Sequence, residues 1–132
     1  MKTVTTILIL AALACGTAYA DCVYPKPPAN IPDGATATLQ QMLSGMSAIK
    51  AYNSTIKAYT DCLRLEHDQQ LAKADPAKMT PAQQKAYAAR KAELDSILIQ
   101  KNDAAVDAAT AVTTRFNDQV RIFKSKHTSA KN

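Results

Sequence analysis

The chain has 132 residues with a formal net charge of +5, and 47% of the residues are hydrophobic while only 5% are aromatic. This length suits one small domain. Three cysteines and two scattered histidines do not form the clustered ligand set that zinc requires, and no catalytic triad or phosphate-binding loop is present, so we expect neither an enzyme nor a cofactor.

Residues 1–20 have the features of a signal peptide. Lys2 gives a positive start, Ile7 to Ala14 form a short apolar run, and residues 18–20 are Ala-Tyr-Ala, which suits the peptidase. The run is too short to cross a membrane, which takes about 20 apolar residues. We therefore predict export to the periplasm or beyond. A lipid-anchored N-terminus at Cys15 is the minor alternative, because the residues before Cys15 match a lipoprotein box poorly.

The mature chain, residues 21–132, keeps only Cys22 and Cys62. An exported chain meets an oxidising compartment, and two cysteines allow only one internal pairing. We predict a Cys22–Cys62 disulfide. A pair of free thiols or a bridge between two chains are the alternatives.

Residues 21–35 contain four prolines and cannot form a helix or a central strand. If Cys22 pairs with Cys62, this segment must run back along the first helix as an extended strap. The helix from Thr38 to Cys62 would be about 36 Å long. The strap from Cys22 to a bend near Gly34 would reach roughly 31 Å in polyproline II geometry, so the two lengths match.

The first helix is predicted over residues 36–74. Its apolar residues include a heptad series typical of a helix–helix seam. That series is Met42, Ile49, Ile56 and Leu63. Thr36 or Thr38 can cap the start, and Pro76 biases the residue before it away from helical angles.

A turn at residues 75–79 leads to a second predicted helix at residues 80–125, followed by a basic tail at 126–132. Thr80-Pro81-Ala82-Gln83 combines an N-cap, a proline at the first helical position and a capping-box glutamine. The apolar stripe is weakest at Lys101–Asp103, where we place any kink.

So short a turn favours neighbouring helices, and the predicted fold is all-α. We expect a long antiparallel two-helix hairpin with a proline-rich strap fastened by the disulfide, as a single domain. Counting outward from the turn places Ile49 opposite Ala105 and Met42 opposite Val112. The second helix then extends beyond the first at its C-terminal end.

The N-terminal half resembles a group of small uncharacterised exported proteins of proteobacteria. The likeness rests on Cys22-x-x-Pro25, on Ile31-Pro32-Asp33-Gly34, on Met42, and on Tyr52, Tyr59 and Cys62. It covers roughly the first 45 mature residues. The resemblance implies a secreted helical protein and says nothing about activity.

His67 stands among carboxylates, with Asp61, Glu66 and Asp68 nearby in sequence. Such a cluster could act as a general base or a weak metal site. We interpret it as solvated helix surface, because no nucleophile or second histidine lies at a matching spacing.

The overhanging end of the second helix is the predicted interaction surface. It is formed by Val120 and Phe123, with Arg121 and Lys124 setting the charge at its rim. We expect this end to dock a second copy or an unidentified protein partner.

These features predict an exported helical interaction module of the periplasm or envelope, with a structural, assembly or chaperone-like role. The alternative is a binder of anionic envelope components through the basic C-terminal end. An inhibitor or immunity factor is a further reading. We expect no nucleic-acid partner and no transmembrane segment in the mature chain.

Overall fold

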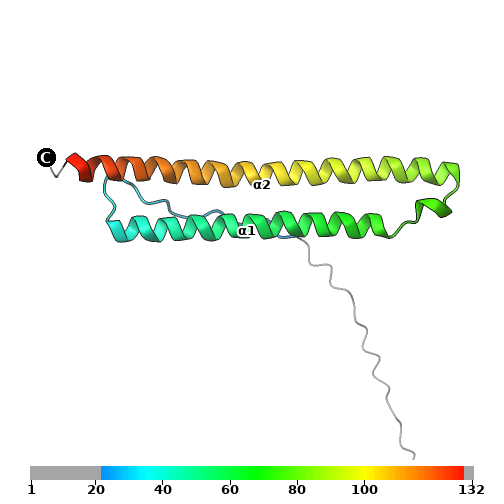
Figure 1. The fold of residues 1–132 in the computed structure, drawn as a ribbon, viewed down its shortest axis with the longest axis horizontal. Coiled ribbons are helices and arrows are strands. Elements are labelled where there is room, and N and C mark those ends of the chain that lie inside the picture. The colour runs from blue at the N-terminus through cyan, green and yellow to red at the C-terminus, as the bar shows by residue number, and fades with distance from the viewer. Residues whose placement is uncertain (1–21, 130–132) are drawn as a thin grey trace, which may run out of the picture.

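The computed structural model describes residues 22–129, and this part of the chain is all-α (Figure 1). Helix α1 spans Leu39–Ala72, a short 3-10 helix η1 spans Pro76–Lys78, and helix α2 spans Pro81–Ser129. No strand occurs within the described residues. The predicted helical class is confirmed. The observed bounds differ most at the C-terminal end, where α2 continues four residues past the expected 125.

Both long helices begin at the capping signals in the sequence. The Thr38 hydroxyl accepts a hydrogen bond from the Gln41 backbone N–H, and the Gln41 side chain accepts one from the Thr38 N–H. Thr80 and Gln83 form the same reciprocal pair at the start of α2. Each box satisfies backbone donors that the first turn of a helix leaves free.

The connection between the helices runs outward before the chain turns back. Asp75 caps η1 by accepting a hydrogen bond from the Ala77 N–H. The Gln84 side chain donates to the carbonyls of Pro76 and Met79, so η1 lies against the first turns of α2. In Figure 1 this connection passes beyond the end of α1 before α2 begins. As a result, the first turns of α2 face the connection rather than α1.

This outward path changes which residues of the two helices meet. The His67 ring pairs with Asp95 at 2.8 Å, and the Asn53 amide bonds to Thr113 at 3.3 Å. Both partners lie further along α2 than a compact five-residue turn would place them. The expected pairing of Ile49 with Ala105 is therefore wrong.

The core consists of two clusters along the seam between α1 and α2. The cluster nearer the connection contains Tyr52, Ile56, Tyr59, Leu63 and Ala105. The other cluster contains Met42, Ile49 and Phe116. Ala105 is completely buried, which lets the bulky α1 side chains approach α2 without voids.

Helix α2 is continuous through Lys101–Asp103, the position at which the sequence favoured a kink. The core clusters include α2 residues on the C-terminal side of this stretch, Ala105 and Phe116, and buried Leu94 lies on its N-terminal side.

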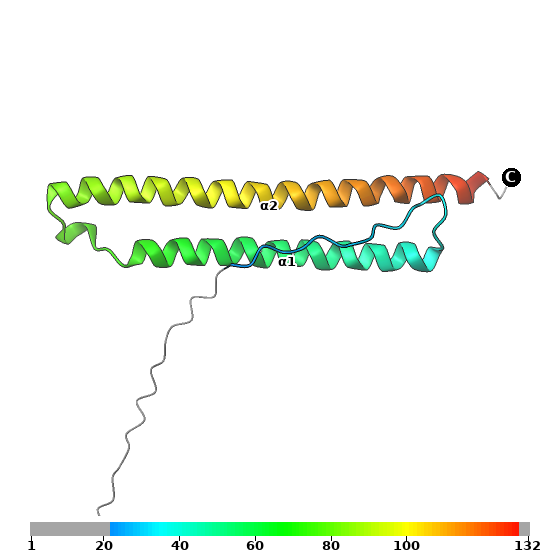
Figure 2. The same ribbon diagram turned by 180° about the vertical axis from the view of Figure 1, so that it is seen from behind.

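An extended N-terminal segment, residues 22–38, lies along the helix pair (Figure 2). Cys22 is joined to Cys62 of α1, so the predicted disulfide is confirmed. Burial within the segment recurs every third residue, and the residues between are exposed. The partly buried series is Cys22, Pro25, Pro28 and Ile31. Three residues per turn is the repeat of a polyproline II helix, so one edge of the segment faces the groove between the helices.

The N-terminal segment turns into α1 at Gly34, where it meets α2. The Gly34 N–H donates to the Gln119 side chain at 2.9 Å, and the Lys126 ammonium donates to the Ala35 carbonyl at 2.7 Å. A Cβ atom on Gly34 would overlap the α2 backbone at Gln119. The bend therefore requires glycine because of its close approach to α2.

Candidate functional site

The C-terminal end of α2 extends past the start of α1 (Figure 1), but Val120 and Phe123 do not belong to this overhang as the sequence had suggested. Val120 and Phe123 are partly buried and pack against the cluster of Met42 and Phe116. The shifted pairing of the helices brings these residues opposite the start of α1. Their apolar side chains are therefore partly covered within the chain.

The charged residues predicted at that rim lie on the surface. Arg121 pairs with Asp118 one turn earlier in α2, and Lys124 is exposed. Lys126, assigned to the basic tail, is helical and bonds to the bend at Ala35. One cation of the basic end therefore contacts the bend of the N-terminal segment. The remaining tail, residues 130–132, lies outside the described residues.

His67 is not solvated helix surface, as the sequence had suggested. Only 13% of its side chain is exposed. Its Nδ1 lies 3.1 Å from an Asp68 carboxylate oxygen on α1, and its Nε2 lies 2.8 Å from Asp95 on α2. Two carboxylate acceptors can both be satisfied only if both ring nitrogens carry protons. The geometry thus favours the imidazolium form, which links the two helices.

The charged groups around His67 shift one another's pKa values. The Asp68 and Asp95 carboxylates raise the pKa of His67 above its ordinary value. The Lys91 ammonium, 2.6 Å away, and His67 lower the pKa of Asp95, and Asp95 in turn raises the pKa of Lys91. These groups form a neutralised chain of opposite charges across the helix seam. Within residues 22–129 no group of three or more potential ligands is arranged to hold a metal ion.

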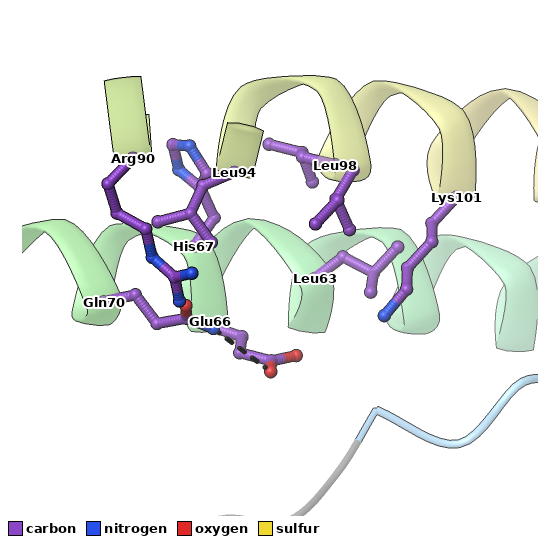
Figure 3. A pocket seen from close by; sticks show the side chains of 9 residues that line it. Leu63, Glu66, His67, Gln70, Arg90, Leu94, Leu98 and Lys101 are labelled. Atoms are coloured by element: carbon purple, nitrogen blue, oxygen red, sulfur yellow. Dashed lines mark hydrogen bonds between the residues drawn. The ribbon is translucent and has the colours of Figure 1, made fainter. Parts of the chain in front are cut away.

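The helix pair extends past the point where the described part of the N-terminal segment begins (Figure 1, Figure 3). A hollow of about 220 Å³ lies between α1 and α2 there. Its apolar floor is formed by Leu63, Leu94 and Leu98. Arg90 and Lys101 reach down from α2 at its two ends, while Glu66 lies on the α1 side. We call this hollow the terminal groove.

The opposite side of the helix pair carries a second groove that no described segment covers. Asn53 and Cys62 are nine residues apart on α1, which places them about 180° apart around the helix. The Asn53–Thr113 bond therefore marks the side facing away from the disulfide. An open hollow of about 260 Å³ lies here, lined in part by Asn53, Ile56 and Val106.

Exposed apolar side chains follow this second groove on both helices. Residues seven apart lie on the same side of a helix, so two heptad series extend from the Asn53–Thr113 pair. We call the six residues of these series the open face: Leu39, Met46, Asn53, Ile99, Val106 and Thr113. Its apolar members are 38% to 61% exposed.

The sequence contains a signal for the open face that does not by itself distinguish it from the buried seam. The heptad spacing of Leu39 with Met46 and of Ile99 with Val106 was visible. Because two series of apolar residues run along each helix, only the observed pairing decides which one is buried. For the His67–Asp95 contact the sequence carried no signal, since the two residues are 28 positions apart.

Comparison of the chain with protein-family models, curated proteins and solved structures finds no match. Among the described residues, no helix combines the length and apolarity needed to cross a membrane.

Proposed function

We propose that the protein is an exported helical interaction module that binds a helical partner, or a second copy of itself, along the open face. The observation that carries the proposal is the row of exposed apolar side chains beside a groove between two helices. Leu39 and Ile99 are 61% and 59% exposed. Exposed apolar rows of this kind mark interaction sites, because burying them against another helix removes apolar area from water.

The architecture we propose for this module is an antiparallel hairpin with the N-terminal segment as its strap. The strap covers one groove and the disulfide holds its end in place, which supports a rigid platform. An internal disulfide fits an oxidising compartment, so we propose export to the periplasm or beyond. The role is binding rather than catalysis.

A matched pair of substitutions tests the proposal. Ile99→Glu places a charge on the open face, whereas Leu65→Glu places one at an equally exposed apolar residue that lines neither groove. Light scattering over a concentration series would detect self-association, and capture from periplasmic extract would detect a partner. We expect Ile99→Glu to abolish the association or the captured partner, and Leu65→Glu to retain it.

A wild-type protein that stays monomeric, and whose captured proteins are unchanged by Ile99→Glu, would contradict the proposal. Binding that Ile99→Glu leaves intact but that disappears at high salt would instead support the anionic-component alternative. Phe123 is unsuitable for this test, because it packs in the core and its loss would disturb folding.

A further inference from the structure

The terminal groove lies on the same side of the helix pair as the N-terminal segment, next to the anchored end of that segment. Cys62, where the segment is anchored, and Glu66, which lines the terminal groove, are four residues apart and so lie on the same side of α1. The apolar floor passes from the buried cluster at Tyr59 and Leu63 into the terminal groove without interruption. One surface is therefore covered along part of its length and open along the rest.

The covered part shows which kind of chain this groove accepts. An extended segment lies in it, and every third residue from Cys22 to Ile31 faces the helices. Two of these residues, Pro25 and Pro28, are partly buried and need no backbone partner, and the Tyr24 hydroxyl between them and Cys22 donates to the Ala104 carbonyl of α2. This side of the helix pair therefore accommodates an extended, proline-rich segment with a three-residue repeat.

The charges at the terminal groove select the chemistry of an occupant. Lys101 forms no ion pair within the described part of the chain, and Arg90 contacts only Glu93, one turn further along α2, at 3.4 Å. Arg90 and Lys101 are eleven residues apart on α2, or about 16 Å. Five residues of polyproline II cover nearly the same distance, at about 3.1 Å each.

We propose that the terminal groove docks an extended, proline-containing segment of a partner protein that carries two carboxylates five residues apart. The carboxylates pair with Arg90 and Lys101. Two prolines three positions apart lie between them and pack on the floor formed by Leu63, Leu94 and Leu98. The segment lies end to end with this chain's own N-terminal segment.

Glu66 would limit which segments can bind at this site. It lies between the two cations on the α1 side, where its only hydrogen bond comes from the Gln70 amide at 3.4 Å within the described residues. A third carboxylate in the middle of the segment would face Glu66 and be repelled. A backbone N–H there would instead find an acceptor. Acidic residues are therefore favoured at the two ends and disfavoured in the centre.

Fluorescence anisotropy with labelled hexapeptides tests the proposal on the oxidised mature protein. The probe is EPAAPE, which has carboxylates five residues apart and prolines three apart. We expect it to bind at least tenfold more tightly than KPAAPK, and more tightly than EPEEPE despite the higher negative charge of the latter. Lys101→Gln should weaken EPAAPE binding at least fivefold.

Two control variants separate this site from other surfaces. Lys124→Gln removes an exposed cation at the far end of α2, and Ile99→Glu disrupts the open face. Both should leave EPAAPE binding unchanged, so the proposal for this site and the proposal for the open face can be contradicted separately. Equal binding of EPAAPE and KPAAPK, or binding unaffected by Lys101→Gln, would overturn the proposal. So would Lys101-dependent binding to phosphatidylglycerol vesicles without peptide binding, because the occupant would then be a membrane surface.

Discussion

The two sides of the helix pair differ in how the seam between α1 and α2 is covered. On one side the N-terminal segment lies over the seam and is joined to α1 by the Cys22–Cys62 disulfide. On the other side the Asn53–Thr113 hydrogen bond spans an uncovered groove. A pair of helices has two grooves, and one short segment can fill only one of them. The open side therefore keeps a row of exposed apolar side chains that no described segment covers.

On the covered side, the N-terminal segment is attached to the helices in two different ways. At one end a covalent bond fixes the segment to α1. At the other end the fixation depends on fit, because Gly34 lies against the α2 backbone and Pro32 fills the space beside Gly45. A Cβ atom on Gly45 would lie 2.7 Å from the Pro32 ring. The following experiments separate these contributions.

Removal of the disulfide should have the largest effect on the covered side. Cys62→Ser opens a loop with a sequence separation of 40 residues, and the chain-entropy model gives about 4 kcal/mol as an upper guide to the lost stability. Urea unfolding followed by circular dichroism measures the change. Reduced wild type should match the variant. A variant as stable as the oxidised wild type would show that the segment is held by packing alone.

Disruption of the bend at Gly34 should have the second-largest effect on stability. Gly34→Ala forces the segment away from α2, breaks the bond to the Gln119 side chain, and should cost about 1–3 kcal/mol. Asn30→Ala changes an exposed residue of the same segment and serves as the control, with a change below about 0.5 kcal/mol. The same urea midpoints compare the two variants, and equal midpoints would refute the close contact at Gly34.

A substitution beneath the N-terminal segment should raise stability. The Tyr52 hydroxyl is buried without a hydrogen-bond partner among the described residues, and burial raises the pKa of this tyrosine. Tyr52→Phe keeps the ring and removes the unsatisfied hydroxyl, so we expect a gain of about 1 kcal/mol in unfolding free energy. Tyr87→Phe, at a half-buried residue, is the control. A loss of stability in Tyr52→Phe would mean that the hydroxyl has a partner, such as a bound water.

The smallest expected effect concerns the His67 link between the helices. The Asp68 and Asp95 carboxylates hold the pKa of folded His67 above 6.5, so the folded state binds the proton more tightly than the unfolded chain. This contribution is fully present below pH 6.5 and is lost as the pH rises through the raised pKa. Both carboxylates are more than one-third exposed, so the loss should stay below about 1 kcal/mol.

Urea midpoints at about pH 5.5 and pH 8.5 test this link, with His67→Gln as the reference. Wild type should lose more stability than the variant between the two values. Asp95 cannot produce this change, because its pKa lies below 3.8 and its own contribution is lost only in acid. Parallel pH profiles for the two proteins would argue that His67 is neutral in the folded state.

Local signals in the sequence were sufficient to predict the secondary-structure elements and the disulfide. The capping boxes at Thr38 and Thr80 mark the observed starts of α1 and α2. Such contacts involve neighbours three residues apart, so the sequence displays them directly. The C-terminal ends of the helices were harder to predict, since α2 reaches Ser129 without any stop signal.

The surfaces that carry the functional proposals could not be derived in this way. The sequence alone determined the helices, the extended N-terminal segment and the pairing of Cys22 with Cys62, because propensity, proline and cysteine chemistry act locally or leave a single choice. Only the tertiary structure decided which α2 residues face α1. The outward path of the connection through η1 goes with a pairing that partly buries Phe123 and leaves Ile99 exposed. Sliding one helix along another changes few local interactions, so this choice depends on the packing of the whole seam.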